Sequence, residues 1–439
     1  MKKLFAIGRK IIPTKLFKAL QPFWHLTWVF VASFIYGYPS KNMVVIAVTG
    51  TKGKTSTANY IWSVLTAGGY KTGLIGTANI RIGEKELLNT YHMTMPGPFV
   101  FQKLLYDMKK ADCTHVVVEV TSEGIKLNRH RGISIDTVVF TNLYPEHLPS
   151  HGGSFEKYKE TKGIVFKKAK TIIANADSEH ASYYLNNPAD KKITFSIDYP
   201  SNFKATNIET TSQGMNFKVD NDNFSLSIPG IFNIYNALGA LVTARALNLP
   251  TTAIQKGLSS LTLIPGRMEK IDCDQSFTVF VDYAHEKQSM GLLLKTAKKM
   301  GGRIIILLGA EGGGRDKAKR PAMGELAGKL ADYVIVSNVD PYDDNPQEII
   351  EDIAKVAEIQ GKIRNQNLFT IENRREGIAK ALSLATAGDI VLITGKGSEQ
   401  SMILGTKTIP WDDRIIVRKE LNKIKSPRPA NLIDKGQRD

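Results

Sequence analysis

The chain has 439 residues, enough for two or three domains with cores of ordinary size. A hydrophobic content of 42% and a charged content of 23% are typical of globular proteins, and two distant cysteines argue against a disulfide framework or a zinc site. The net charge of +16 points to an acidic partner, but no nucleic-acid-binding motif accompanies the basic residues, so we expect no nucleic-acid partner.

The N-terminal segment, residues 1–40, distributes its charge unevenly. Residues 1–18 carry six Lys or Arg and no acid, whereas residues 19–40 carry no formal charge. Three alternatives stay open: a helix in the interface of an anionic membrane, a helix packed on the protein's own core, and a membrane span, which Pro22 and His25 disfavour. We expect a cytoplasmic protein, at the inner face of the membrane under the first alternative. The sequence does not indicate the oligomeric state.

Residues 44–65, VVIAVTGTKGKTSTANYIWSVL, predict a phosphate-binding loop between a strand and a helix. The loop consists of Gly50, Thr51, Lys52, Gly53, Lys54, Thr55 and Ser56. Glycines let backbone N–H groups approach an anion, and the start of the helix adds a positive dipole. We expect Lys54 to reach the β- and γ-phosphates and the Thr55 hydroxyl to bind Mg²⁺. No guanine-reading N-K-x-D tetrapeptide is present, so ATP is the expected nucleotide.

Strands and helices alternate after this loop, which predicts a mostly parallel sheet covered by helices. Strands are expected at residues 114–122, 135–143 and 170–177, then shorter strands in 190–228 and a helix at 233–247. A second alternation, after residues 264–272, has strands at 277–284, 303–310, 332–338 and 389–397. We therefore predict an α/β protein with three parts: the segment 1–40, a central P-loop ATPase domain at 41–264, and a Rossmann-like domain at 265–439.

Several chemically capable side chains follow predicted strands, where α/β sheets bind ligands. Glu119 ends a strand and suits Mg²⁺, although a solvated acid is an almost equal alternative. Asp282 is placed to bind a ribose hydroxyl. The glycine turn in residues 311–325 carries Arg315 and Arg320, which suit a carboxylate or phosphate. Residues 141–166 hold acids, histidines and lysines, and by themselves read as a polar loop and a helix start.

Taken together, these motifs resemble the Mur ligase family of ATP-dependent amide-forming ligases, from about Val44 to Leu421. The resemblance is strongest to its muramoyl-tripeptide synthetase branch. The matching motifs are T-G-T-K-G-K-T-S, E-V-T-S at Glu119, T-N-L-x-x-E-H-L at Thr141, Y-x-x-x-K ending at Lys162, G-x-F-N-x-Y-N at Gly230, P-G-R-M-E at Pro265, D-Y-A-H at Asp282, G-R-D-x-x-K-R-P at Gly314, G-K-G-S-E at Gly395 and W-D-D-R at Trp411.

The resemblance implies roles for individual residues. Catalysis would rest on Lys54, Lys162 and His147, with Lys162 carbamylated. The metal ligands would be Thr55, Glu119, His147 and Lys162. The nucleotide would contact the phosphate loop and Asn233, Asn236, Arg267 and Asp282. The two substrates would contact Thr94, Ser122, Arg315, Arg320, Asp343, Asp344, Gly395 and Glu399.

The implied reaction uses ATP and Mg²⁺ to phosphorylate a carboxylate of a glycopeptide precursor, and the amine of a free amino acid then attacks the acyl phosphate. The first strand begins at Val44, so little sequence precedes it for the family's UDP-binding domain, and the carrier of the donor stays open. Tyr342 stands where the diaminopimelate-adding branch has an arginine, which favours lysine over meso-diaminopimelate. The alternatives are a folyl- or polyglutamate-type ligase and a non-catalytic, membrane-associated ATP-binding protein.

Overall fold

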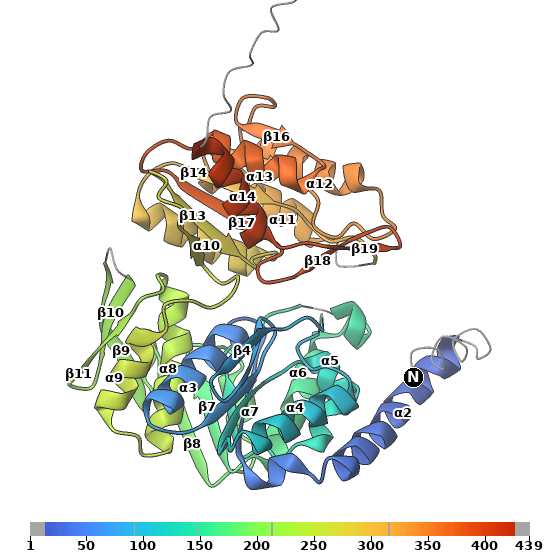
Figure 1. The fold of residues 1–439 in the computed structure, drawn as a ribbon, viewed down its shortest axis with the longest axis vertical. Helices are drawn as coiled ribbons and strands as arrows, with labels where there is room; N and C mark the ends of the chain where they lie inside the picture. The colour runs from blue at the N-terminus through green and yellow to red at the C-terminus, as the bar shows by residue number, and fades with distance from the viewer. Residues whose placement is uncertain (1–13, 92, 147, 212–213, 315–316, 426–439) are drawn as a thin grey trace, which may run out of the picture. The chain divides into compact units, whose positions relative to one another are not determined.

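The computed structural model describes residues 14–91, 93–146, 148–211, 214–314 and 317–425. The chain divides into two compact units, one ending at Pro265 and the other beginning at Gly266, and each is described here by itself (Figure 1). Both units are α/β, as the sequence predicts.

Unit 1 is built on an 11-stranded sheet with the order β11-β10-β9-β8-β7-β6-β1-β5-β2-β3-β4. The strands are β1 Val44–Thr49, β2 Thr72–Ile75, β3 Asn79–Ile82, β4 Lys85–Leu88, β5 His115–Val120, β6 Thr137–Phe140, β7 Thr171–Asn175, β8 Lys191–Ser196, β9 Phe203–Thr211, β10 Gly214–Val219 and β11 Asp222–Leu226. Pairing is parallel from β2 to β9 and antiparallel at both ends of the sheet.

The central strands β1, β5 and β6 are almost free of charge because both of their faces are buried. In their parallel register, Val48 lies opposite Glu119, and Thr49 lies opposite both Val120 and Phe140. The carboxyl ends of these three strands therefore meet at one edge of the sheet. Glu119 is the one charged side chain of the three strands, and it lies at that edge.

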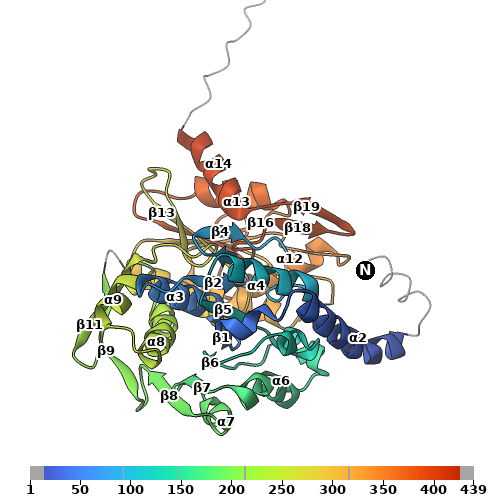
Figure 2. The ribbon, with the colours of Figure 1, turned by 60° about the horizontal axis from the view of Figure 1, so that its bottom comes forward.

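Helices cover both faces of the sheet in unit 1 (Figures 1 and 2). They are α3 Lys54–Ala67, α4 Pro98–Lys110, α5 Ser122–Lys126, α6 Phe155–Gly163, α7 Ala181–Leu185, α8 Ile231–Ala246 and α9 Thr251–Ser260, with short 3-10 turns η1 Pro39–Asn42, η2 Arg129–Gly132, η3 Leu148–His151 and η4 Ile164–Lys168. On one face, alternate strand residues such as Val118 and Phe140 form a core with α4, α6 and α7. On the other face, α3 packs against α8 and α9.

The N-terminal helix α2, Thr14–Ile35, lies outside these layers and packs against α4 and η2. This contact fits the expectation of a helix packed on the protein's own core. No helix within the described part of the chain is both long and apolar enough to cross a membrane.

Unit 2 has a six-stranded sheet with the order β12-β13-β17-β14-β15-β16, in which only the β12–β13 pair is antiparallel. The strands are β12 Glu269–Ile271, β13 Thr278–Asp282, β14 Ile304–Leu308, β15 Tyr333–Val336, β16 Leu368–Thr370 and β17 Ile390–Thr394, followed by the hairpin β18 Ser401–Leu404 and β19 Lys407–Pro410. The helices are α10 Lys287–Met300, α11 Lys319–Leu330, α12 Pro346–Ile359, α13 Arg374–Ser383 and α14 Asp413–Lys425. Residues of α13 and α14 join the core on one face of this sheet.

Candidate active site

The predicted phosphate loop joins β1 to α3 at the carboxyl edge of the unit 1 sheet. Gly50 and Gly53 have φ angles of +149° and +83°, which disfavour any other residue. A Cβ on Gly50 would lie 2.0 Å from Thr141 Oγ1, and one on Gly53 would lie 2.5 Å from Asn236 Oδ1. The loop thus needs glycine for both its conformation and its close packing. It leads into the positive end of a 14-residue helix, an arrangement that fits a phosphate group.

The segment after β6 holds the loop in place. The amide N–H of Thr51 donates to the carbonyl of Asn142 at 2.9 Å, and that of Lys52 donates to Asn142 Oδ1 at 2.9 Å. Thr141 Oγ1 donates to the Lys52 carbonyl at 2.7 Å, and the Lys52 amine pairs with Glu146 at 2.9 Å. The conformation of the loop is therefore set by a segment about ninety residues away in the chain.

Lys54 and Lys162 converge on the same carbonyl oxygen. Lys54 Nζ donates to the Gly50 carbonyl at 3.0 Å and to the Thr51 carbonyl at 2.9 Å, and Lys162 Nζ donates to the Gly50 carbonyl at 2.8 Å. The Lys162 side chain is only 2% exposed. Burial, together with the charge of Lys54, lowers the pKa of Lys162 well below its usual value. The Lys162 amine is therefore held toward its neutral, nucleophilic form.

Glu119 is fully buried and accepts three hydrogen bonds at the end of β5. Its donors are Thr55 Oγ1 at 3.0 Å, Thr77 N at 2.7 Å and Thr77 Oγ1 at 2.9 Å. The structure thus joins Thr55 to Glu119, two residues predicted to hold Mg²⁺. A carboxylate beside a hydroxyl is a donor set of hard oxygens, which fits that ion. Thr77 follows β2 without a recognisable motif, so no sequence signal could have identified it.

Of the predicted substrate residues, Thr94 extends this network, and Ser122 makes a separate pair two residues beyond the end of β5. Thr94 shares a hydrogen bond of 2.9 Å with Thr77, and Ser122 shares one of 3.1 Å with Nε2 of the buried His151. Arg129, which the sequence reasoning did not single out, donates to the carbonyl of Met95 next to Thr94, and its Nε is buried without a hydrogen-bond partner. A cation in this position suits a carboxylate substrate.

Asn233 and Asn236 lie on the first turns of α8, beside the phosphate loop. Asn236 Oδ1 accepts from Thr57 Oγ1 at 3.2 Å, and Asn236 Nδ2 donates to Asn233 Oδ1 at 3.1 Å. The close approach of Asn236 to Gly53 brings this pair to the start of α3. The packing of α8 on α3 thus brings together residues about 180 positions apart.

In unit 2, predicted site residues gather where the neighbouring strands β13 and β17 end. Asp282 accepts backbone N–H groups of Met268 and Ala284, each at 2.7 Å. Burial raises the pKa of Asp282 although the charge of Arg267 opposes it. The amide of Gly395 donates to the Asp282 carbonyl at 3.2 Å.

Glu399 lies beside the same strand ends. It accepts from Tyr283 Oη at 3.1 Å and pairs at 2.6 Å with Lys396, which also contacts Asp340 at 2.8 Å. The sequence reasoning gave no role to Lys396, although it lies within the G-K-G-S-E motif.

Arg320 forms a second charged cluster in unit 2. Its guanidinium lies 2.9 Å from Asp352 and 3.5 Å from Asp344, so two predicted substrate residues, Arg320 and Asp344, pair with each other. A Cβ on Gly312 would lie 2.9 Å from Asp344 Cβ, and one on Gly313 would lie 2.6 Å from the Tyr342 ring. The glycine turn therefore packs on the loop that follows β15, where Asp343 is exposed.

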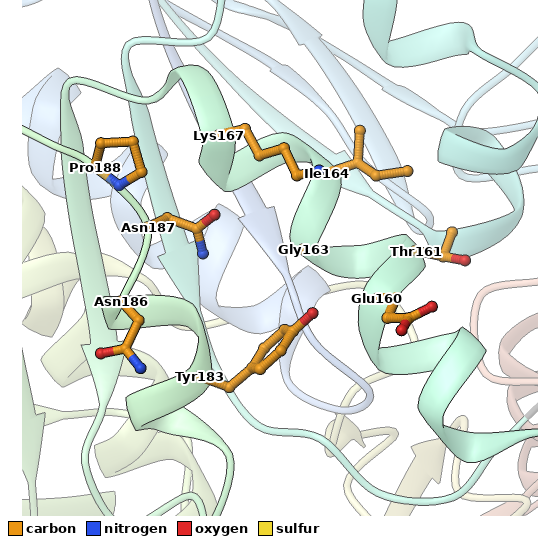
Figure 3. Close-up of a pocket in the computed structure, with 9 residues that line it drawn as sticks. All are labelled: Glu160, Thr161, Gly163, Ile164, Lys167, Tyr183, Asn186, Asn187 and Pro188. Carbon is orange, nitrogen blue, oxygen red and sulfur yellow. The ribbon is translucent and has the colours of Figure 1, made fainter.

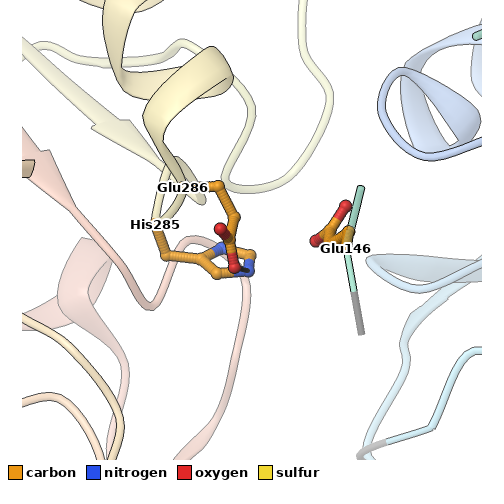
Figure 4. Close-up of side chains that lie close together, drawn as sticks. All are labelled: Glu146, His285 and Glu286. Atoms are coloured by element: carbon orange, nitrogen blue, oxygen red, sulfur yellow. Dashed lines mark ion pairs between the residues drawn. The ribbon is translucent and has the colours of Figure 1, made fainter. Parts of the chain in front are cut away.

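The predicted residues His147 and Arg315 lie outside the described residues. In unit 2, His285 and Glu286 follow the Asp282 motif and lie beside each other, with 3.9 Å between His285 Nε2 and Glu286 Oε1 (Figure 4).

A cavity of about 700 Å³ opens in unit 1 among α6, η4 and the end of α7 (Figure 3). It is lined by Glu160, Thr161, Gly163, Ile164, Lys167, Tyr183, Asn186, Asn187 and Pro188. None of the predicted site residues is among them.

Comparison with known proteins identifies the family. Residues 48–244 match the model of the Mur ligase middle domain, and residues 266–397 match that of the Mur ligase glutamate ligase domain. A Clostridium acetobutylicum protein named UDP-N-acetylmuramoyl-L-alanyl-D-glutamate–2,6-diaminopimelate ligase 1 is 36% identical over 89% of this chain and 80% of its own. A solved structure with the name of that ligase has a TM-score of 0.60 at 29% identity, covering 88% of this chain and 79% of the other.

A more distant neighbour bears on the fold alone. Mycobacterium tuberculosis folylpolyglutamate synthase complexed with ADP has a TM-score of 0.67 at 21% identity, covering 84% of this chain and 91% of the other. The chain belongs to the Mur ligase family, whose members are ATP-dependent ligases that form a carbon–nitrogen bond and release ADP.

Proposed function

We propose that this ligase joins a diamino acid to the D-glutamate carboxylate of a muramoyl-dipeptide, a step in making peptidoglycan precursors. The observation that carries the proposal is the connected network Thr55–Glu119–Thr77–Thr94, which links the nucleotide loop to residues predicted to contact the donor. The name of the Clostridium acetobutylicum relative, which specifies a muramoyl-alanyl-glutamate donor and diaminopimelate, supports it.

The reaction needs an activated carboxylate, because a carboxylate in water is a poor electrophile. The phosphate loop and Lys54 hold the triphosphate so that its γ-phosphoryl group passes to the donor carboxylate, which yields an acyl phosphate and ADP. The acceptor amine then attacks the acyl carbon, and phosphate leaves as the amide forms. Mg²⁺, held by Thr55 and Glu119, would neutralise charge on the phosphoryl oxygens.

Lys162 has a role that its low pKa supports. A neutral amine reacts with CO₂ to give a carbamate and a proton, so the lowered pKa of Lys162 increases the share of the reactive neutral amine for the carbamylation that the family resemblance implies. The carbamate would carry a negative charge close to Lys54 and would add a hard oxygen ligand for Mg²⁺.

A steady-state assay of ADP release tests the proposal. We expect turnover to require the muramoyl-dipeptide donor together with a diamino acid, and Lys54→Ala to abolish it while the melting temperature stays unchanged. Lys41→Ala, at an exposed lysine before β1, is the matched control. Turnover with a folate or polyglutamate donor and none with muramoyl-dipeptide would overturn the proposal in favour of the folyl-type alternative.

The identity of the diamino acid rests on two opposed observations. The name of the relative supports meso-diaminopimelate. Tyr342 has no charge to match a distal carboxylate, and Arg320 is already paired with Asp344 and Asp352, which supports lysine as the second candidate. Competing the two amino acids in the same ADP-release assay decides between them, and Tyr342→Arg is expected to raise the preference for diaminopimelate.

A further inference from the structure

We propose that helix α2 docks the protein on an anionic lipid bilayer through its outward face. This inference is independent of the proposed reaction, because it rests on the surface of α2 and on the charge of the residues around it.

The inward face of α2 is a normal packing surface. Val29, Ala32 and Ser33 are at most 2% exposed, and the Trp28 ring lies 5.6 Å from that of Phe99 at the start of α4. A Cβ on Gly132 of η2 would lie within 3.1 Å of both Val29 and Ser33, so the helix and η2 are in close contact. These contacts orient α2 and determine which of its side chains face away from unit 1.

The outward face of α2 is apolar. Phe23, Phe30 and Phe34 are 70%, 50% and 74% exposed, and their spacing of seven and four residues places them on one side of the helix. Ile35, 60% exposed, is the last residue of the same helix. A helix on the surface of a globular protein normally turns charged residues outward, so a row of exposed phenylalanines indicates a partner. We call Phe23, Phe30 and Phe34 the aromatic face.

The charges around the aromatic face select the partner. The sequence of residues 1–18 carries six Lys or Arg and no acid, and residues 19–40 carry no formal charge. Beyond the C-terminal end of α2, Lys41 lies 4.7 Å from the centre of the Tyr38 ring. Lys110 of α4 lies over Tyr106, whose ring is 5.7 Å from that of Tyr36. In the sequence, basic residues flank the apolar stretch on both sides, which suits anionic headgroups, with aromatic rings at the headgroup level.

The arrangement of α2 fits binding along the surface. Both views show α2 at the edge of unit 1, with its C-terminal end against the unit and its N-terminal end leading away from it (Figures 1 and 2). An interfacial helix needs one apolar side and one side that avoids lipid, and here unit 1 covers the second side. The same turn, η2, begins at Arg129, which donates to the carbonyl of Met95 next to the predicted substrate residue Thr94, so the docking helix packs near the donor side of the candidate site.

Vesicle flotation of the full chain tests this inference. We expect the protein to float with vesicles of phosphatidylcholine and phosphatidylglycerol, to float much less with phosphatidylcholine alone, and to bind more weakly as salt is raised. The double variant Phe30→Ser, Phe34→Ser should lose about tenfold or more in vesicle affinity, because it removes two side chains that would enter the interface. Both positions are exposed, so the melting temperature and the ADP release in solution should be unchanged.

A matched control distinguishes binding through α2 from non-specific binding of exposed apolar side chains to vesicles. Ile359 and Ile363 in unit 2 are 77% and 53% exposed, and the double variant Ile359→Ser, Ile363→Ser should bind vesicles as the unaltered protein does. Equal losses in both double variants would overturn the inference, as would flotation with neither vesicle. Light scattering tests a further alternative. If the unaltered protein is a dimer that binds no vesicles, and the Phe30→Ser, Phe34→Ser variant is a monomer, then α2 binds a second copy of the chain and the inference is wrong.

Discussion

Lys162 in unit 1 and Lys396 in unit 2 are both buried, with side chains 2% and 1% exposed. Their surroundings nevertheless shift the pKa of the two amines in opposite directions. Lys162 donates to the Gly50 carbonyl and has Lys54 as its cationic neighbour, and its pKa is lowered well below the usual value by burial and by that neighbour. Lys396 lies between Asp340 and Glu399 at 2.8 and 2.6 Å. Burial opposes its charge as well, but the two carboxylates outweigh burial and raise the pKa of Lys396.

The difference shows what decides the state of a buried amine. Removal from water disfavours the cation, and only close carboxylates restore it. Lys162 is therefore suited to react as a neutral amine, and Lys396 is suited to act as a permanent cation that holds Asp340 and Glu399 in place. We therefore expect a reactive lysine in unit 1 and a structural one in unit 2.

Replacing Lys162 should have the largest effect on activity. We expect Lys162→Ala to reduce the rate of ADP release by about 10³-fold, equivalent to about 4 kcal/mol in the barrier, because it removes the amine that would carry the negatively charged carbamate at the phosphoryl-transfer site. Short carboxylates should restore part of the rate if the carbamate is the active form. Lys168→Ala, at an exposed lysine six positions along the chain, serves as the control. Full activity of Lys162→Ala would place the reactive group elsewhere.

Replacing Lys396 should mainly affect stability. Lys396→Ala leaves the buried carboxylate of Asp340 and the partly exposed carboxylate of Glu399 without their cation, and we expect a loss of about 3 kcal/mol in the free energy of unfolding. Denaturant unfolding with fluorescence detection measures it. The loss should shrink in Lys396→Arg, which retains the charge. If Lys396→Ala lowers the free energy of unfolding no more than a Lys→Ala substitution at an exposed position does, Lys396 is not a structural cation.

The pH dependence of stability should have opposite signs for the two lysines, with a slope of up to about 1.4 kcal/mol per pH unit for each proton. The folded-state pKa of Lys162 is below 10.5, so the unfolded chain binds the proton more tightly, and stability rises with pH up to 10.5. The folded-state pKa of Lys396 is above 10.5, so its contribution is present below 10.5 and is lost at higher pH.

The two contributions are separated by measuring the free energy of unfolding against pH in CO₂-free buffer, for the unaltered protein and for the variants Lys162→Met and Lys396→Met. Relative to Lys162→Met, the unaltered protein should gain stability as pH rises toward 10.5. The same sign for both lysines would contradict the comparison.

The smallest effect is expected at an exposed ion pair of unit 2. Arg364 makes hydrogen bonds of 2.7 to 3.1 Å with Glu351 and Glu358, but its side chain is 35% exposed. Water and salt screen such pairs, so Arg364→Ala should lower the free energy of unfolding by less than about 1 kcal/mol. The same denaturant titration measures it. A loss as large as that of Lys396→Ala would show that burial is not what separates the two clusters.

Much of the fold could be predicted from local patterns. The apolar runs of β1, β5 and β6 and the helical spacing of α3 and α8 lie where the sequence indicates them, because strands buried on both faces are rich in apolar residues, and Glu119 is the one charged exception. The pattern of the motifs likewise predicted the Mur ligase family, which the comparisons confirm. The strands β2, β3 and β4 were not predicted from the sequence, and the strands within residues 190–228 were expected without their antiparallel pairing, because pairing partners depend on tertiary packing.

The sequence by itself determined where the phosphate loop begins, since Gly50, Gly53 and Lys54 are adjacent in the chain and their backbone requirements are local. Only the tertiary structure decided the direction in which the pKa of Lys162 and that of Lys396 shift. Both are single lysines within short motifs, and no local feature distinguishes them. Burial and the charges of neighbours distant in the chain set the pKa of each, and these exist only once the strands and helices have packed.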